Sequence, residues 1–385
     1  MNDNEPTRIA LLIPQDIGYG RGVLQGIYDQ AVLFPNWRLH HAPPTRHILS
    51  AMKHWYPHGV IAHVMDQRLC EELAQLSIPV VNTTSTISDW SGPLVEVDNG
   101  IIGKLAAEHF LDRGYRHFGY LGSDWAGFSL QREASFRDAI GQAGFELTSC
   151  YLDYLPQPPV DLPWNHIDRE MRAWLQKLPK PVAVLASNDR PGREVVNACE
   201  SLGLGVPADV AVLGVDNDEF ECWTSHPPLS SIVNPSEQIG REAAALMAKI
   251  LANENHNDRF DVIPQRLVIR QSTDAYAVDD PHLKAALQLI RQHYREPLSA
   301  VDVHRHVDCS RRLLERRFRE VLGRSIVDEI RRVRIQRATE LLADTDLKVA
   351  AIAERTGFED ARVFAKAFRR MSGLTPTEYR RQSSR

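Results

Sequence analysis

Polar side chains follow three apolar segments in the N-terminal part of the sequence, at points where parallel strands would end. Asp16 follows RIALLIP (8–14), Asn188 and Asp189 follow AVLAS, and Asp216 follows VAVLGV. Ligands of open parallel sheets lie beyond the carboxyl ends of the strands. Carboxylates and amides there can hold the vicinal hydroxyl groups of a polyol, although Asp216 could also be an ordinary carboxylate at a strand end.

Arginine-rich helices near the C-terminus offer a second chemistry, the recognition of a polyanion. In 311–322, the apolar stripe of Leu313, Leu314, Phe318 and Leu322 leaves outward Arg311, Arg312, Glu315, Arg316 and Arg319. In 361–371, the apolar side of Val363, Phe364, Ala367 and Phe368 leaves outward Arg362, Lys366, Arg369 and Arg370. Helices of this kind fit the major groove of DNA, where guanidinium groups bind guanine edges and phosphates. A solvated helix face is the alternative for any single arginine.

The distribution of charge supports a division between these two chemistries. The net charge is −5, but residues 282–385 carry 23 Lys and Arg against 14 Asp and Glu, and the rest carries 22 against 36. An acidic body with a basic tail indicates that the tail alone meets nucleic acid.

Apolar and amphipathic segments alternate through the first 275 residues, which predicts an α/β fold with parallel sheets covered on both faces. The expected strands are 8–14, 59–64, 79–82, 117–122, 183–188 and 210–216, with further strands ending near 95–98 and spanning 266–272. The expected helices are 20–33, 66–76, 99–113, 127–143, 165–178, 190–203 and 236–252. The polar segment 253–265 is expected to be a loop. Two sheets are predicted, so the sensor at 1–275 would have two lobes, the first about 7–113 and 235–260, the second about 114–234 and 261–275.

The sequence pattern changes after a linker at 276–281. Residues 282–385 are predicted to be helical throughout. Two helix-turn-helix units fit it. In the first, a supporting helix at 298–306 precedes a helix at 311–322 capped by Ser310; in the second, 347–354 precedes 361–371, with Gly357 in the turn and Asp360 as the cap. A helix over 326–343, roughly 27 Å long at 1.5 Å per residue, would join them.

Several function classes are disfavoured. The five cysteines are widely spaced without a Cys-x-x-Cys pair, and the histidine pairs lack the spacing of metal ligands, so neither a metal nor another cofactor is expected. No G-x-G-x-x-G or G-x-x-x-x-G-K-[ST] motif occurs, which argues against an enzyme acting on nucleotides or phosphates. The start MNDNEPTRIA lacks a signal peptide and no long apolar run occurs, so we expect a cytoplasmic protein without membrane association.

The basic domain resembles the AraC family. GFEDARVFAKAFRRMSGLTPTEYR is similar to the family signature, and the preceding segment from SRRLLERRF to ERTGF also fits. By that likeness, the DNA-reading positions would be Arg312, Glu315 and Arg316 in the first unit, with Arg311 beside them, and Ala361, Arg362, Val363 and Lys366 in the second.

The sensor resembles the LacI type of periplasmic-binding-like regulators, in ASNDRPGREVV, VAVLGVDNDEF, PPLSSIV and RLVIRQST. The amino-terminal DNA-binding helices usual in that family are absent. The swapped order, joined at QSTDAY, is similar to that of the regulators of xylose operons. The resemblance places sugar contacts at Arg132, Asp189, Asp216 and Asn234, and the QDIGYGRG loop adds Asp16, Tyr19 and Arg21. Trp125, Phe128, Phe220 and Trp223 are candidates for an aromatic floor under the sugar.

These likenesses imply an allosteric regulator whose sugar effector, D-xylose in the favoured case, changes binding to a double-stranded DNA operator. We expect an activator of pentose-catabolic genes that recruits RNA polymerase and acts as a homodimer on two half-sites, with a sugar-released repressor as the alternative. An enzyme and a transport-associated sugar-binding protein are the competing classes, and both are disfavoured.

Overall fold

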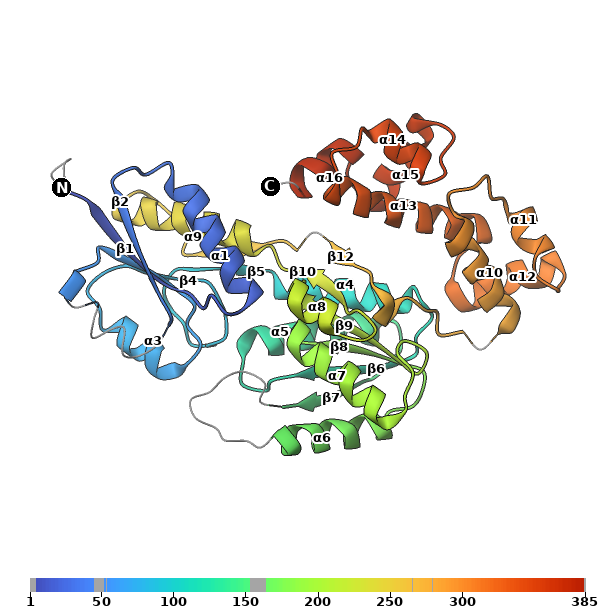
Figure 1. Cartoon of the computed structure of the whole chain (residues 1–385), viewed down its shortest axis with the longest axis horizontal. Helices are drawn as coiled ribbons and strands as arrows, with labels where there is room; N and C mark the ends of the chain where they lie inside the picture. The colour runs from blue at the N-terminus through green and yellow to red at the C-terminus, as the bar shows by residue number, and fades with distance from the viewer. Residues whose placement is uncertain are drawn as a thin grey trace. The chain divides into compact units, whose positions relative to one another are not determined.

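The computed structural model describes residues 5–44, 52, 54–152, 164–264, 266–278 and 280–383. It divides into two compact units (Figure 1): Met1–His109 with Arg116–Ala275, and Phe110–Tyr115 with Tyr276–Arg385. Residue 279 of the predicted linker lies outside the described residues.

The first unit contains two six-stranded sheets, each with helices around it, as expected for the α/β class. The sheet of the first lobe is parallel, in the order β11-β5-β4-β3-β1-β2: β1 (Thr7–Leu12), β2 (Trp37–Ala42), β3 (Gly59–Ala62), β4 (Val80–Asn82), β5 (Leu94–Val97) and β11 (Arg259–Val262). The sheet of the second lobe has the order β12-β10-β9-β8-β6-β7: β6 (His117–Gly122), β7 (Leu147–Tyr151), β8 (Val182–Ala186), β9 (Val210–Asp216), β10 (Ser230–Val233) and β12 (Leu267–Val268). In it, only the β10–β12 pairing is antiparallel among the described strands.

The helices of the first unit agree closely with the expected segments, except that the short helix α8 (Glu219–Thr224) was not expected. They are α1 (Gly18–Ala31), α3 (Gln67–Ala74), α4 (Asn99–Leu111), α5 (Gly127–Gln142), α6 (Trp164–Lys177), α7 (Asp189–Leu202), α8 (Glu219–Thr224) and α9 (Ser236–Leu251). The chain passes between the lobes after β5, after β10 and after β11, so three segments form the hinge. Helix α4 packs so closely on α5 that a Cβ atom at Gly103 would lie 2.5 Å from the Phe136 nitrogen, which requires glycine there.

Two expectations about strands were wrong near the hinge. The predicted polar loop 253–265 contains β11, which pairs with the buried edge of β5. The strand predicted over 266–272 is confined to β12, because a 3-10 turn (Gln271–Thr273) follows. Ser272 holds that turn: its hydroxyl accepts from the Ser230 N–H at 2.8 Å and donates to the Val212 carbonyl at 2.6 Å.

The second unit is helical in its described part. Its helices are α10 (Pro281–His293), α11 (Ala300–Arg305), α12 (Arg311–Leu322), α13 (Ile326–Asp344), α14 (Val349–Arg355), α15 (Ala361–Ser372) and α16 (Pro376–Ser383). The predicted caps are confirmed, since Ser310 accepts from the Leu313 N–H at 3.3 Å and Asp360 from the Arg362 N–H at 2.6 Å. Gly357 has a positive φ of 81°, and a Cβ there would lie 2.3 Å from the Tyr294 carbonyl oxygen.

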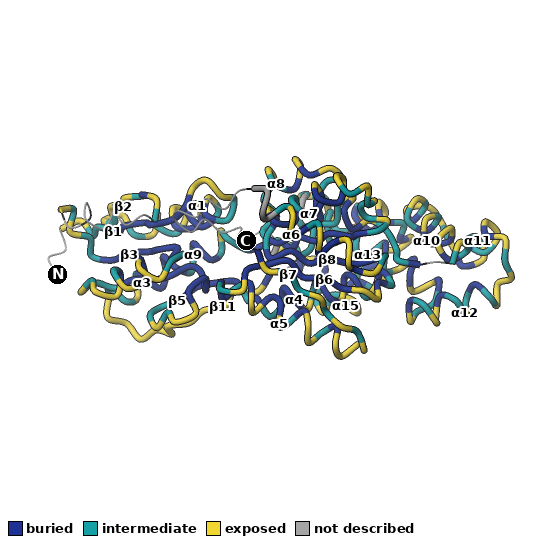
Figure 2. Tube along the Cα trace, turned by 90° about the horizontal axis from the view of Figure 1, so that it is seen from below, coloured by how far each residue is buried: buried dark blue, intermediate teal, exposed yellow. Residues whose placement is uncertain are grey.

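Each helix-turn-helix unit has a hydrophobic core of its own, and α13 contributes to both. Ile326, Ile330 and Val333 pack with α10, α11 and α12, whereas Ile335, Ala338 and Leu342 pack with α14, α15 and α16. Figure 2 shows the central strands of the sensor buried, with exposed residues along its helices and loops. Within the described ranges, none of the helices has both the length and the apolar character that a membrane span needs.

Candidate functional site

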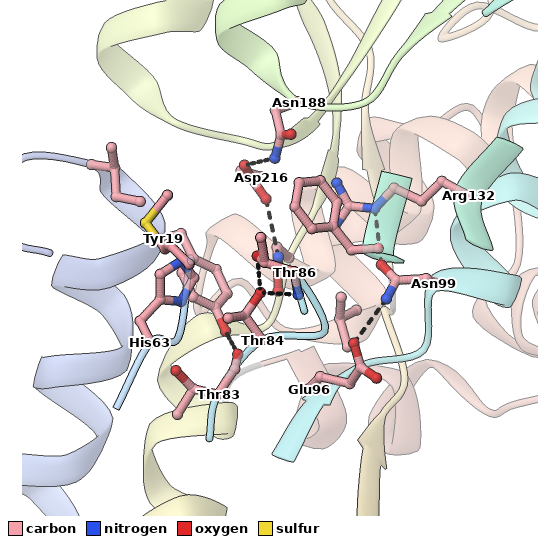
Figure 3. Close-up of a pocket in the computed structure, with 15 residues that line it drawn as sticks. Tyr19, His63, Thr83, Thr84, Thr86, Glu96, Asn99, Arg132, Asn188 and Asp216 are labelled. Atoms are coloured by element: carbon pink, nitrogen blue, oxygen red, sulfur yellow. Dashed lines mark hydrogen bonds between the residues drawn. The ribbon is translucent and has the colours of Figure 1, made fainter. Parts of the chain in front are cut away.

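A cavity of about 80 Å³ lies between the two lobes of the first unit (Figure 3). It is lined by Ile17, Tyr19, His63, Met65, Thr83, Thr84, Thr86, Glu96, Val97, Asn99, Phe128, Arg132, Asn188, Asp216 and Asn234. Most of these residues follow strands or begin the next helix, as expected for a site at the carboxyl ends of parallel strands. The lining is mainly of hydroxyl, amide and ring groups, with one arginine and two carboxylates.

The arginine of the cavity is fixed by hydrogen bonds from both sides. Arg132 is 3% exposed; its Nε donates to Asn99 Oδ1 at 2.9 Å, and its Nη1 donates to the Ser187 carbonyl. The Asn99 amide in turn donates to Glu96 Oε2 at 3.0 Å. The guanidinium also lies 4.9 Å from the centre of the Phe128 ring. These contacts hold a planar donor against the cavity in one orientation.

Asp216 stands at the end of β9 in a strained backbone conformation, with a φ of 111°, and Asn217 follows with a φ of 54°. The Asp216 carboxylate accepts from Asn188 Nδ2 at 2.7 Å and from Asn234 Nδ2 at 3.0 Å. Burial raises the pKa of Asp216, and the nearby Arg132 charge opposes that shift. A carboxylate has about four acceptor positions, so two remain for a ligand.

The wall from the first lobe is made of rings and hydroxyl groups. The Tyr19 hydroxyl donates to the Thr83 carbonyl, and the Tyr19 ring lies 5.2 Å from that of His63. Burial raises the pKa of Tyr19, so the phenol stays protonated. Thr84 and Thr86 share a hydrogen bond of 2.8 Å between their hydroxyl groups.

The residues predicted from the sequence divide between this cavity and a second one. Tyr19, Arg132, Asp216 and Asn234 line the first. The second cavity, of about 540 Å³, shares Tyr19 and Asp216 and adds Asp16, Arg21 and Asp189. Arg21 is half exposed and lies 3.7 Å from Asp218, whose carboxylate also accepts from the Gly18 N–H at 2.8 Å.

Asp189 is committed to the protein itself. It is 1% exposed, and its two oxygens accept from Ser231 Oγ at 2.6 Å and from the Asp218 N–H at 2.7 Å. Burial raises its pKa, with the neighbouring Asp216 charge acting in the same direction. These contacts fix the loop after β9 and so the position of Asp216.

One of the aromatic candidates, Phe128, lines the smaller cavity. Phe220 lines the larger one and is 67% exposed, and Trp223 is 60% exposed with the Arg270 guanidinium 5.2 Å from its ring. Trp125 lines neither cavity. Phe128 is therefore the candidate floor for the apolar face of a sugar ring.

Sequence reasoning missed most of the wall from the first lobe. His63 follows β3, Thr83, Thr84 and Thr86 follow β4, and Glu96 and Asn99 lie where β5 passes into α4. These residues obey the strand-end rule used for Asp16 and Asp216, so polar residues after VIA and PVVN were a usable signal. Among the described residues, no group of three or more His, Cys, Asp or Glu side chains is placed to hold a metal ion.

The first candidate DNA-binding helix is α12, on the outside of the second unit. Leu314, Phe318 and Leu322 are buried, while Arg311, Arg312 and Arg316 are exposed. Glu315 differs from its neighbours because it is half-buried. Arg316 has an exposed ion pair with Glu320 at 3.6 Å.

The second candidate helix is α15, which buries Phe364 and Phe368. Ala361, Arg362 and Lys366 are exposed. Val363, placed on the apolar side by its spacing, is 61% exposed. That placement was wrong, because the two phenylalanines alone set the buried face in the first turns of α15. The exposed position agrees with the DNA-reading role that the resemblance gave to Val363.

The arginines of α13 have separate surroundings. Arg332 Nη2 donates to Glu329 Oε1 at 2.8 Å, and Arg334 donates to the carbonyls of Tyr294 and Glu296, each at 2.8 Å. Arg331 is exposed, with Asp328 at 3.8 Å. Arg332 and Arg334 thus stabilise the unit itself.

A cavity lined by hydroxyl, amide, guanidinium and carboxylate side chains, together with two exposed basic helices, is typical of a ligand-sensing, DNA-binding protein. Comparison with family models agrees: a periplasmic binding protein-like domain matches residues 107–273, and a helix-turn-helix domain matches 303–382. The chain has the architecture of the transcriptional regulators that join a periplasmic-binding-protein-like sensor to an AraC-type helix-turn-helix domain.

Relatives with this domain order match along nearly their whole length. The xylose operon regulatory protein of Escherichia coli K12 is 29% identical over 383 residues, covering 97% of this chain and 96% of the relative. That of Haemophilus influenzae is 27% identical, covering 97% and 98%. The solved structure of a xylose-binding transcription activator is 26% identical, covers 98% of both chains and has a TM-score of 0.62.

Proposed function

We propose that this protein is a cytoplasmic transcription factor that binds D-xylose and, in response, activates genes for pentose catabolism. The names of its relatives support this proposal, because they combine control of a xylose operon with transcriptional activation. Tyr19, Arg132, Asp216 and Asn234 would contact the sugar. Arg311, Arg312, Arg316, Arg362 and Lys366 would contact DNA.

The observation that carries the proposal is the composition of the cavity of about 80 Å³. Its hydroxyl, amide and guanidinium groups match vicinal hydroxyls, and the larger cavity of about 540 Å³, which shares Tyr19 and Asp216 with it, supplies the volume that a monosaccharide needs. The positive charge of Arg132 is faced by two carboxylates, Glu96 and Asp216. No excess of positive charge remains for a phosphate, so the ligand should be a neutral sugar rather than a sugar phosphate.

The wall of the cavity comes from both lobes, which gives the sugar a way to control the sensor. Tyr19 and His63 belong to the first lobe, and Arg132, Asn188 and Asp216 to the second. A ligand that bridges the lobes binds the closed arrangement better than the open one. It shifts the equilibrium by that difference in affinity.

A thermal-unfolding panel on the purified protein tests the effector. Stabilisation follows RT ln(1 + [L]/Kd), about 2.7 kcal/mol at a hundredfold excess over Kd. D-Xylose should raise the unfolding temperature more than L-arabinose, D-ribose or D-glucose, and D-xylose 5-phosphate should have no effect. The proposal would be contradicted if D-xylose 5-phosphate stabilised the protein and D-xylose did not, or if none of these sugars stabilised it.

The direction of regulation and the assembly are tested separately. A reporter gene measured with and without D-xylose separates an activator from a repressor. With an activator, the sugar raises expression above the level of a strain that lacks the protein. With a repressor, deletion of the protein raises expression. We infer a homodimer on two direct-repeat half-sites, with RNA polymerase recruited beside it, because doubling the site raises specificity. Light scattering that gives one chain per operator duplex would rule the dimer out.

A further inference from the structure

One side chain in the small cavity has a buried polar atom that the protein leaves unsatisfied. His63 follows β3, is 7% exposed and lines the cavity. Its Nδ1 atom is buried, with no hydrogen-bond partner among the described residues. In Figure 3 the ring lies beside that of Tyr19, which supplies a ring contact and no hydrogen bond. Buried polar groups in folded proteins nearly always have a partner, so an exception needs a reason.

The surroundings of His63 determine which partner it can take. Burial lowers the pKa of His63 to about 4, so the imidazole is neutral near pH 7. A neutral imidazole has one donor and one acceptor nitrogen. A hydroxyl group can satisfy either nitrogen, because it both donates and accepts. An anionic ligand would gain no charge attraction from this ring.

A second residue that lines the same cavity also has a buried polar atom without a partner among the described residues. Asn234 follows β10 and is 6% exposed, and its Nδ2 donates to Asp216 Oδ1 at 3.0 Å. That bond fixes the orientation of the amide, because the nitrogen must face the carboxylate. Its Oδ1 is left buried without a partner in the described part of the chain.

We propose that His63 is a specificity-determining residue of the sensor, whose Nδ1 atom hydrogen-bonds one hydroxyl group of a neutral monosaccharide while Asn234 Oδ1 accepts from another. This inference rests on the proposed function and deepens it, because it names the first-lobe group that reads the hydroxyl pattern. Sugar epimers differ only in where their hydroxyls point. A fixed neutral ring in the cavity wall distinguishes them, because the wrong epimer leaves Nδ1 unsatisfied.

Two substitutions separate hydrogen bonding from packing. His63→Leu removes both ring nitrogens at similar bulk, and His63→Asn keeps a polar atom close to the position of Nδ1. Loss of a buried hydrogen bond should weaken D-xylose binding of His63→Leu by about 10- to 100-fold, with His63→Asn retaining part of the affinity. His58→Leu is the matched control. It lies at the other end of the same strand, where its Nδ1 accepts from the Arg8 N–H at 2.9 Å, so its loss should leave sugar affinity unchanged.

The decisive measurement is calorimetric titration of the full chain with D-xylose analogues that each lack one hydroxyl group. For one analogue, the native protein should lose about tenfold in affinity relative to D-xylose, and His63→Leu should lose nothing further. Thermal unfolding of each variant confirms folding. If His63→Leu does not fold, His63→Asn gives the test with the same analogues. Its loss of affinity for that one analogue should differ from the tenfold loss of the native protein.

Other outcomes overturn the inference. If every analogue loses affinity by the same factor on the native protein and on the His63 variants, the histidine only packs against the site. If the native protein binds D-xylose and the variants bind it equally well, His63 does not read the ligand although the proposed function stands. If the native protein binds no neutral sugar, the proposed function falls and this inference falls with it.

Discussion

Two carboxylates, Glu329 in the helical unit and the half-buried Asp216 in the sensor, are held in opposite ways. In the helical unit, Glu329 is fully buried and accepts from Arg332 Nη2 at 2.8 Å, from the Tyr276 hydroxyl at 2.5 Å and from Arg324 Nε at 2.5 Å. Burial alone would raise the pKa of Glu329, but Arg332 and Arg324 lower it to about 2. In the sensor, Asp216 accepts from the neutral amides of Asn188 and Asn234 among the described residues, and burial raises its pKa.

The difference shows what each charge is for. A buried carboxylate matched by arginines has satisfied its lone pairs and neutralised its charge, so it fixes the position of α13 and has nothing left to bind. A carboxylate held by amides keeps lone pairs open at a cavity. Such a group costs stability until a ligand donates to it, which is typical of a binding site.

Removing Glu329 should have the largest effect. Glu329→Gln leaves Arg324 and Arg332 without their shared counter-charge, which should destabilise the helical unit by about 3–5 kcal/mol. Denaturant unfolding of the full chain, followed by circular dichroism, measures this loss. Glu320→Gln is the control, because its ion pair with Arg316 is exposed and should be worth under about 1 kcal/mol. Equal losses in the two variants would break the comparison.

The two carboxylates should give stability profiles of opposite sign in pH. The folded pKa of Glu329 is near 2 and its ordinary value is 4.5, so its contribution of about 3 kcal/mol is complete above pH 4.5 and is lost as the pH falls towards 2. The pKa of Asp216 is raised above its ordinary 3.8, so its contribution is present below pH 3.8 and is lost as the pH rises through the folded pKa. The free energy of unfolding is measured between pH 2 and 7 for the native protein, Glu329→Gln and Asp216→Asn. The difference between the native protein and each variant isolates the contribution of that carboxylate. Parallel slopes in the two difference curves would contradict this account.

Asp216→Asn should reverse the pattern seen at Glu329. The amide removes a buried charge, so stability should hold or rise, whereas sugar affinity should fall by about 10- to 100-fold because a charge-assisted hydrogen bond is lost. Calorimetry with D-xylose and thermal unfolding supply the two values. A loss of folding stability as large as that of Glu329→Gln would make Asp216 a structural residue.

Exposed arginines should affect DNA binding alone. Arg316→Ala on α12 should weaken operator binding by about 1–2 kcal/mol without changing the unfolding temperature. If Arg316 reads a base, the loss should depend on the DNA sequence; if it contacts phosphate, all duplexes should lose equally. Fluorescence anisotropy on several duplexes distinguishes these cases. Arg324→Ala, which belongs to the Glu329 cluster, should instead lower stability.

The sequence predicted most helices and most strands, because caps and apolar spacing are local signals. Ser310 and Asp360 both cap the helices they were expected to cap. The strand β11 was missed because its pairing with β5 lies more than 160 residues away in the sequence, and the alternation in RFDV spans only four residues of a polar segment.

The candidate site could be predicted only in part. Strand-end reasoning found Asp216 but missed His63, which follows β3 by the same rule, because a histidine is not a typical sugar ligand. Asp189 also follows a strand, yet its oxygens turn inward to Ser231 and Asp218. The direction in which a side chain points at a strand end depends on contacts between distant segments. The spacing of residues in the sequence does not reveal those contacts.

The central claim is that one neutral sugar, held by the unmatched polar groups of the sensor, changes how the helical unit binds DNA. The most direct test measures the affinity of the full chain for a duplex selected with that chain, with and without saturating D-xylose, for the native protein and Asp216→Asn. We expect the sugar to change the affinity of the native protein by about 5-fold or more and that of the variant by much less. An unchanged affinity in the native protein, or an equal change in both, would contradict the account.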